Sequence, residues 1–111
     1  MLNLKEREQV IVYSKKLNIT NLSPLRSGNI SVRGIQNEVE GFFITPSGKK
    51  YENLKPKDIV FLSLSEDKDF LSWFNSGKNP SSEWRFHQDI YKSKWEAKAI
   101  VHAHSPNATA V

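Results

Sequence analysis

The chain of 111 residues has no cysteine, no long apolar run and no block of like charge. Without cysteine there are no disulfides, thiolate zinc sites or thiol nucleophiles, so any metal must be held by His, Asp or Glu. No stretch approaches the roughly 20 apolar residues of a membrane-spanning helix, and the start M-L-N-L-K-E-R-E has no apolar signal core. We therefore expect a cytoplasmic protein without a membrane partner.

Charge is nearly balanced, with 16 Lys and Arg against 12 Asp and Glu and a formal net charge of +4. The lysines are spread from Lys5 to Lys98 among acidic residues, without an arginine-rich block or an RNA-binding signature, so we expect no nucleic-acid partner. The hydrophobic share of 38% and the charged share of 25% are typical of a globular chain. The length predicts one folding unit.

The first segment has a helical pattern. Val10, Tyr13, Ser14 and Leu17 are spaced i, i+3, i+4 and i+7, which predicts a helix over residues 4–17 that packs through this face.

Short β-like stretches follow. Residues 29–33 and 41–45, separated by polar turn residues at 36–38, predict a hairpin. Residues 58–64 form the most apolar strand candidate, which we expect to be a central strand of the sheet.

The last third of the chain predicts a helix and a strand. Serines at 81–82 offer N-cap chemistry, Glu83 falls in the expected first turn, and helical spacing continues over residues 82–94. Residues 98–102 read as another strand, and Ser-Pro at 105–106 as the start of a further helix. This order of helices and strands favours mixed α/β layers.

Two of the three histidines form an H-x-H pair at the end of that last strand. Because side chains alternate along a strand, His102 and His104 would point to the same side and could share a divalent ion. The alternative is a pair of ordinary polar residues at a strand end. Glu83 is a candidate further ligand; His87, one helical turn after it, is the rival that we leave out of the site.

Small polar residues stand where predicted strands and helices begin or end. Their N–H groups, hydroxyls and amide suit a phosphate group, although each alone reads as an ordinary turn or cap. Arg33, Lys49 and Lys50 could add charge, but solvated surface is the better interpretation of all three. The candidate phosphate-binding residues are Ser27, Gly28, Asn29, Ser47, Gly48, Ser81 and Ser82.

Four motifs together carry a resemblance to a known family. G-N-I-S-V-R at 28–33, I-T-P-S-G at 44–48, K-N-P-S-S-E-W-R-F-H at 78–87 and V-H-A-H-S at 101–105 occur in an order and spacing similar to the class II aldolase/adducin family. The likeness covers about residues 5 to 111 and is strongest to the bacterial L-fuculose-1-phosphate aldolase type.

The resemblance implies a fold and a site. It implies a three-layer α/β/α fold with a central mixed, largely antiparallel sheet, and a zinc ion, or another divalent metal, held by Glu83, His102 and His104. Of the loop residues named above, it assigns substrate phosphate to six: Gly28, Asn29, Ser47, Gly48, Ser81 and Ser82. Glu83 would also act as general acid/base.

The activity implied is that of a zinc-dependent aldehyde-lyase. Such an enzyme cleaves a phosphorylated ketose, such as L-fuculose 1-phosphate, to dihydroxyacetone phosphate and an aldehyde through a metal-stabilised enediolate. The alternatives are a sugar-phosphate dehydratase or 4-epimerase of the same family, or a non-catalytic adducin-like interaction module.

Members of this family are about twice as long as this chain. We therefore expect residues 1–111 to be one domain of this type, incomplete at its C-terminus. The third metal-binding histidine and the tyrosine that acts as an acid would lie beyond residue 111. The resemblance implies a homotetramer for the full-length protein.

Overall fold

The structure of the protein is a computed structural model that describes residues 3–19, 29–47, 51–64, 80–81 and 83–102. Helices and strands lie where the sequence predicts them, with ends shifted by a few residues, and two short 3-10 helices are added. In chain order the elements are α1 (Leu4–Ile19), β1 (Asn29–Gln36), β2 (Val39–Ile44), η2 (Tyr51–Asn53), η3 (Pro56–Asp58), β3 (Val60–Ser63), α3 (Trp84–Ser93) and β4 (Ala99–His102). The further helix expected from 105–106 lies outside the described residues.

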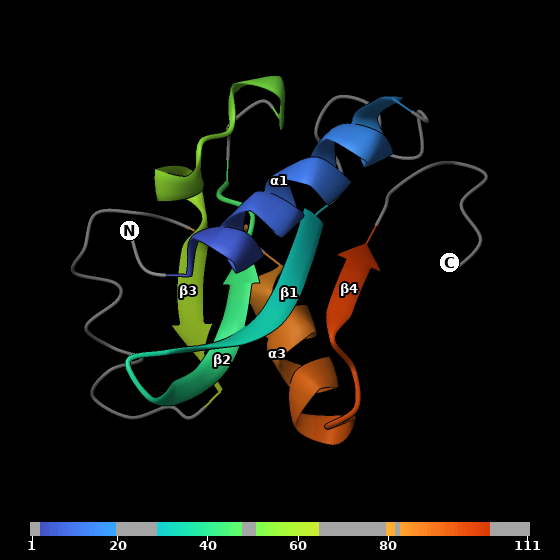
Figure 1. Ribbon diagram of the computed structural model, residues 1–111. Helices are drawn as coiled ribbons and strands as arrows, with labels where there is room; N and C mark the ends of the chain where they lie inside the picture. The colour runs from blue at the N-terminus through green and yellow to red at the C-terminus, as the bar shows by residue number, and fades with distance from the viewer. Residues whose placement is uncertain (1–2, 20–28, 48–50, 65–79, 82, 103–111) are drawn as a thin grey trace.

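The four strands form one sheet in the order β3-β2-β1-β4, and each neighbouring pair is antiparallel. Figure 1 shows α1 crossing one face of this sheet and α3 lying behind the other. The predicted three-layer α/β/α arrangement with a largely antiparallel sheet is therefore confirmed for the part of the chain that the structure describes. No helix within the described ranges is long and apolar enough to cross a membrane.

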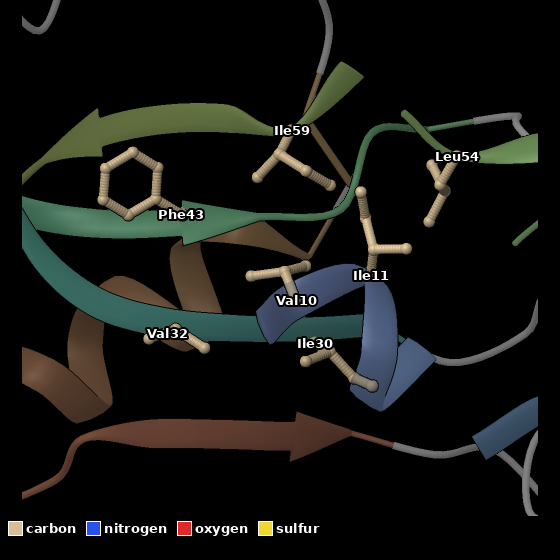
Figure 2. Close-up of a cluster of buried hydrophobic side chains, with 7 residues drawn as sticks. All are labelled: Val10, Ile11, Ile30, Val32, Phe43, Leu54 and Ile59. Carbon is tan, nitrogen blue, oxygen red and sulfur yellow. The ribbon is translucent and has the colours of Figure 1, made fainter. Parts of the chain in front are cut away.

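The face of the sheet under α1 holds the first apolar cluster (Figure 2). Alternate residues of β1 and β2 point toward α1, because successive side chains of a strand face opposite sides of the sheet. Seven buried side chains meet here: Val10, Ile11, Ile30, Val32, Phe43, Leu54 and Ile59.

The opposite face holds the second cluster, under α3. Phe42, next to Phe43 in the sequence, points to this side and packs with Ile44, Val60, Leu62 and Tyr91. Its ring centroid lies 5.2 Å from that of Tyr91. The position of α3 on the sheet, and of the side chains at its start, thus depends on this cluster.

The expectation that residues 58–64 form a central strand is wrong for the described sheet, where β3 is an edge strand. The physical reason is that β3 contributes side chains to both apolar clusters. Phe61 packs on the α1 side, whereas Val60 and Leu62 pack on the α3 side. A continuous apolar run therefore reports burial on both faces, which an edge strand shares with a central one when helices cover it.

The buried face of α1 also differs from the expected one. Val10, Ile11 and Ser14 are buried, whereas Tyr13 is exposed. The side chain of Leu17 lies outside the described residues. The hydroxyl of Ser14 donates to the carbonyl oxygen of Val10 at 2.7 Å, so a polar residue occupies the core face without an unpaired hydroxyl hydrogen.

The hairpin between β1 and β2 has a turn of only two residues, Asn37 and Glu38. Both have positive φ, 51° and 66°, as in a type I′ turn, whose twist matches that of the flanking strands. The register is set from this turn, since Gln36 faces Val39. Further along, Gly41 lies so close to β3 that a Cβ atom there would be 2.1 Å from the carbonyl oxygen of Leu62, so only glycine fits without a shift of the backbone.

Candidate functional site

The start of α3 is tied to the end of β2. Pro46 and Pro80 form an isolated antiparallel bridge, and the N–H of Ser81 donates to the carbonyl oxygen of Thr45 at 2.8 Å. Ser47 follows directly on this bridge, so Ser47 and Ser81 belong to neighbouring backbone segments. Two of the predicted phosphate-binding residues are thus brought together by backbone contacts.

The helix starts slightly later than predicted. α3 begins at Trp84, and Glu83 is its N-cap residue rather than a residue of the first turn. The physical reason lies in Ser81, whose carbonyl oxygen accepts from the N–H of Trp84 at 3.1 Å and whose Oγ accepts from the N–H of Glu83 at 3.3 Å. These bonds form a turn before the helix, which holds Glu83 at the helix end next to the sheet.

Asn29 links this carboxylate to the sheet. Asn29 is buried at the start of β1, and its Nδ2 donates to Oε2 of Glu83 at 2.6 Å. In the sheet register Asn29 lies opposite His102, the last residue of β4. The starts of β1 and α3 and the end of β4 therefore meet at one edge of the structure, which is where a shared ligand of Glu83 and His102 would have to lie.

Several predicted site residues cannot be placed. The structure describes only the backbone of His102, and five predicted residues lie outside the described parts of the chain. Within the described residues no group of three or more His, Asp or Glu is close enough to hold a metal ion. The three-ligand site stays a prediction, as does the role of Asn29 in binding phosphate. The five residues are Ser27, Gly28, Gly48, Ser82 and His104.

The structure adds a buried polar network that the sequence reading missed. The ring of His87 is bonded through Nε2 to Oδ1 of Asn29 and through Nδ1 to Oγ of Ser31, the latter at 2.6 Å. Ser31 Oγ also lies 2.8 Å from the hydroxyl of Tyr91. The ring of His87 stacks on Phe42, with 6.5 Å between ring centroids and 16° between planes. His87 is thus a buried histidine satisfied by hydrogen bonds.

A signal for this network was present in the sequence. Asn29 and Ser31 are spaced by two along a strand, while Glu83, His87 and Tyr91 are spaced by four along a helix. Polar residues with these two periods can face one another across a strand and a helix packed on it. The spacing of Glu83 and His87 indicated a shared face, but not that Asn29 would lie between them.

Arg33 closes the other end of α3. Its Nε donates to the carbonyl oxygen of Ala97 at 2.7 Å, and its Nη2 donates to those of Tyr91 at 2.8 Å and Lys94 at 3.0 Å. The guanidinium also lies over the ring of Tyr91, with Cζ 4.8 Å from the centroid. The expectation that Arg33 is solvated surface is therefore wrong, because the last carbonyls of a helix lack partners within it and attract a cation. Lys49 and Lys50 lie outside the described residues.

Burial raises the pKa of Tyr91 to about 12, although the hydrogen bond with Ser31 and the charge of Arg33 act in the opposite direction. The unfolded chain loses this proton near pH 10 and the folded chain only near pH 12, so stability falls as pH rises through this range. We expect the free energy of unfolding, measured by urea titration at a series of pH values, to fall less steeply above pH 10 in Tyr91→Phe. Tyr13→Phe, at an exposed position, should keep the wild-type slope; equal slopes in all three proteins would contradict the assignment.

Taken together, the chain is a three-layer α/β/α domain with a carboxylate and a strand-end histidine at one edge of its sheet. A family model described as the class II aldolase and adducin N-terminal domain matches residues 8–111. The chain belongs to this family.

Named relatives agree with this assignment. A 5-methylthioribulose-1-phosphate/5-deoxyribulose-1-phosphate aldolase of Escherichia coli O45:K1 is 38% identical over 111 residues, which are 100% of this chain and 47% of that protein. An L-fuculose phosphate aldolase of Escherichia coli K12 is 38% identical over 107 residues, 96% of this chain and 45% of that protein.

A solved structure of an L-fuculose 1-phosphate aldolase superposes with a TM-score of 0.71 at 32% identity, covering 92% of this chain and 45% of that one. The chain thus spans about half the length of the relatives that it matches.

Proposed function

We propose that this chain is part of a divalent-metal-dependent aldehyde-lyase that cleaves a ketose 1-phosphate to dihydroxyacetone phosphate and an aldehyde. The single observation that carries the proposal is the bond between Asn29 and Glu83 beside the strand pair that ends at His102. It brings a carboxylate to the strand end from which the H-x-H motif continues. Two relatives are named as aldolases of phosphorylated sugars, one of 5-methylthioribulose 1-phosphate and 5-deoxyribulose 1-phosphate and one of L-fuculose phosphate, and these names support this class of substrate.

The residue types of the predicted metal site fit a divalent ion. A carboxylate and two imidazoles are ligands that zinc accepts, and a catalytic zinc commonly has three protein ligands and an open position. Glu83, His102 and His104 would hold the ion, and the ion would neutralise negative charge on substrate oxygens. The partly buried position of Glu83, which accepts a hydrogen bond from Asn29, gives one carboxylate oxygen a fixed direction.

The chain's own residues suit two other requirements of the reaction, proton transfer and binding of the phosphate group. Cleavage between C3 and C4 removes the proton of the C4 hydroxyl, whose oxygen becomes that of the aldehyde. The electron pair of the broken bond stays as negative charge on the fragment that becomes dihydroxyacetone phosphate. Glu83 would take this proton on a carboxylate oxygen and return it to C3. The bridged segments that carry Ser47 and Ser81 would bind the phosphate through hydroxyl and N–H groups, together with Gly28, Asn29, Gly48 and Ser82.

The Nδ2 group of Asn29 carries two hydrogens, and its bond to Glu83 uses one of them.

Assembly of the full-length protein as a homotetramer is part of the same proposal.

The metal assignment is tested by zinc analysis of the purified full-length protein. We expect a stoichiometric amount of zinc in the wild type after gel filtration, and close to none in the His102→Ala, His104→Ala double variant or in Glu83→Gln. Glu96→Gln changes an exposed carboxylate in the segment between α3 and β4 and should retain the wild-type amount. Equal zinc in the wild type and the double variant would defeat the assignment. Circular dichroism of each variant shows whether the fold is kept.

The reaction is tested on the full-length protein. Release of dihydroxyacetone phosphate from a panel of ketose 1-phosphates is expected, whereas a dehydratase, an epimerase or an interaction module would release none. Absence of release from every sugar of the panel would contradict the lyase proposal.

A further inference from the structure

Four buried polar side chains connect the candidate site to the interior between β1 and α3. Ser31 and His87 are 0% exposed, Tyr91 is 1% and Asn29 is 4%. A buried polar group without a hydrogen bond costs stability, so a chain of such groups persists only when donors and acceptors match along it. The matching is therefore informative about where each hydrogen lies.

The direction of the network can be followed from the carboxylate inward. Asn29 donates to Glu83 through Nδ2, which leaves Oδ1, an acceptor, facing Nε2 of His87. Nε2 must then carry a hydrogen and donate it.

At the other end, Oγ of Ser31 lies 2.8 Å from the hydroxyl of Tyr91 and 2.6 Å from Nδ1 of His87. If Tyr91 donates to Ser31, the hydrogen of Ser31 is left for Nδ1 of His87, which then accepts it. In the reverse direction Nδ1 would donate to Ser31 and Ser31 to Tyr91, but a ring with its single hydrogen on Nδ1 would have none on Nε2 to donate to Oδ1 of Asn29.

We propose that His87 is a positioning residue that fixes the amide of Asn29 with its Nδ2 toward Glu83. The physical basis is that an amide has two orientations of nearly equal shape. In the other orientation Nδ2 would face the N–H of His87, and Oδ1 would face the carboxylate of Glu83, so both contacts would be repulsive. A His87 ring with hydrogen on Nε2 allows only the first orientation. This inference rests on the proposed function, in which Glu83 holds the metal.

The substitution His87→Phe tests the proposal, since it keeps a ring on Phe42 and removes both nitrogens. We expect zinc affinity, measured by competition with a chromophoric chelator, to fall about 10–100-fold, as for other partners that orient a metal ligand. His87→Gln, which can still donate to Asn29, should recover part of the loss.

Gln88→Leu is the matched control. Gln88 is the next residue of the same helix, is 2% exposed and donates to the carbonyl oxygen of Ser63 at 3.1 Å, away from Glu83. The Gln88→Leu variant loses a buried hydrogen bond outside the network, so its zinc affinity should equal that of the wild type. Equal affinity in wild type and His87→Phe, or an equal loss in Gln88→Leu and His87→Phe, would overturn the proposal.

A second measurement needs no variant and no metal. Nitrogen-15 NMR of the histidine rings in the metal-free chain should show hydrogen on Nε2 of His87, and a ring without hydrogen on Nε2 would overturn the proposal. If the wild type binds no divalent metal, the proposed function fails, while this spectrum still shows whether Nε2 of His87 donates to Asn29.

Discussion

Replacement of Phe42 by alanine is expected to lower the free energy of unfolding by about 3–5 kcal/mol, because it empties a well-packed buried position. Phe42 is 0% exposed and contacts the rings of Tyr91 and His87, so the cavity would open beneath the buried side of α3. The same substitution should weaken zinc binding, since the ring of His87 would lose the surface on which it stacks. Urea denaturation followed by circular dichroism measures the first effect, and chelator competition the second.

Phe86→Ala is the control for this experiment. It makes the same chemical change on α3 at a side chain that is 47% exposed. Because less apolar area is removed from a buried setting, we expect a loss of only about 1 kcal/mol. Similar losses for Phe42→Ala and Phe86→Ala would show that the cluster between the sheet and α3 is not packed as described.

Replacement of Arg33 by alanine is expected to cost about 2–3 kcal/mol, because three carbonyl oxygens at the end of α3 and in the segment after it lose a charged donor. Arg33→Lys should recover only part, since one ammonium group does not reproduce the planar fork of a guanidinium. The free energy of unfolding from urea titration is again the measure. The end of α3 should also exchange its amide hydrogens faster with solvent.

Arg85→Ala serves as the comparison for Arg33. Arg85 is exposed on the same helix and lies over the ring of Trp84, with Cζ 4.7 Å from the centroid. An exposed contact of this kind changes stability by about 0.5 kcal/mol or less. A loss for Arg85→Ala as large as that for Arg33→Ala would contradict the capping role of Arg33.

The order of elements could be predicted because each depends on local patterns. The turn at Asn37 and Glu38 and the turn at Ser81 before α3 are set by neighbouring residues, so both could be located from the sequence to within a few residues. Two expectations failed because they depend on the third dimension. The position of β3 at the edge depends on which strands pair, and the exposure of Tyr13 depends on where α1 crosses the sheet.

The candidate site shows the same division. Glu83 and Asn29 were identified separately, from their motifs, but their contact depends on how α3 packs on β1. His87 was set aside as a rival ligand, because sequence spacing does not distinguish a side chain that faces solvent from one that faces a strand. The buried partners Asn29 and Ser31 decide its role, and these lie more than 50 residues away in the chain.

The tight hairpin turn has a consequence for residues far from it. Phe42 and Phe43 are neighbours in β2 that serve opposite layers, so which ring reaches which helix is decided by how many residues precede them. One residue added between Gln36 and Val39 would shift β2 by one place against β1 and would exchange the two rings. The length of the turn therefore determines that Phe42, rather than Phe43, lies against the ring of His87, although the turn itself is not part of the site.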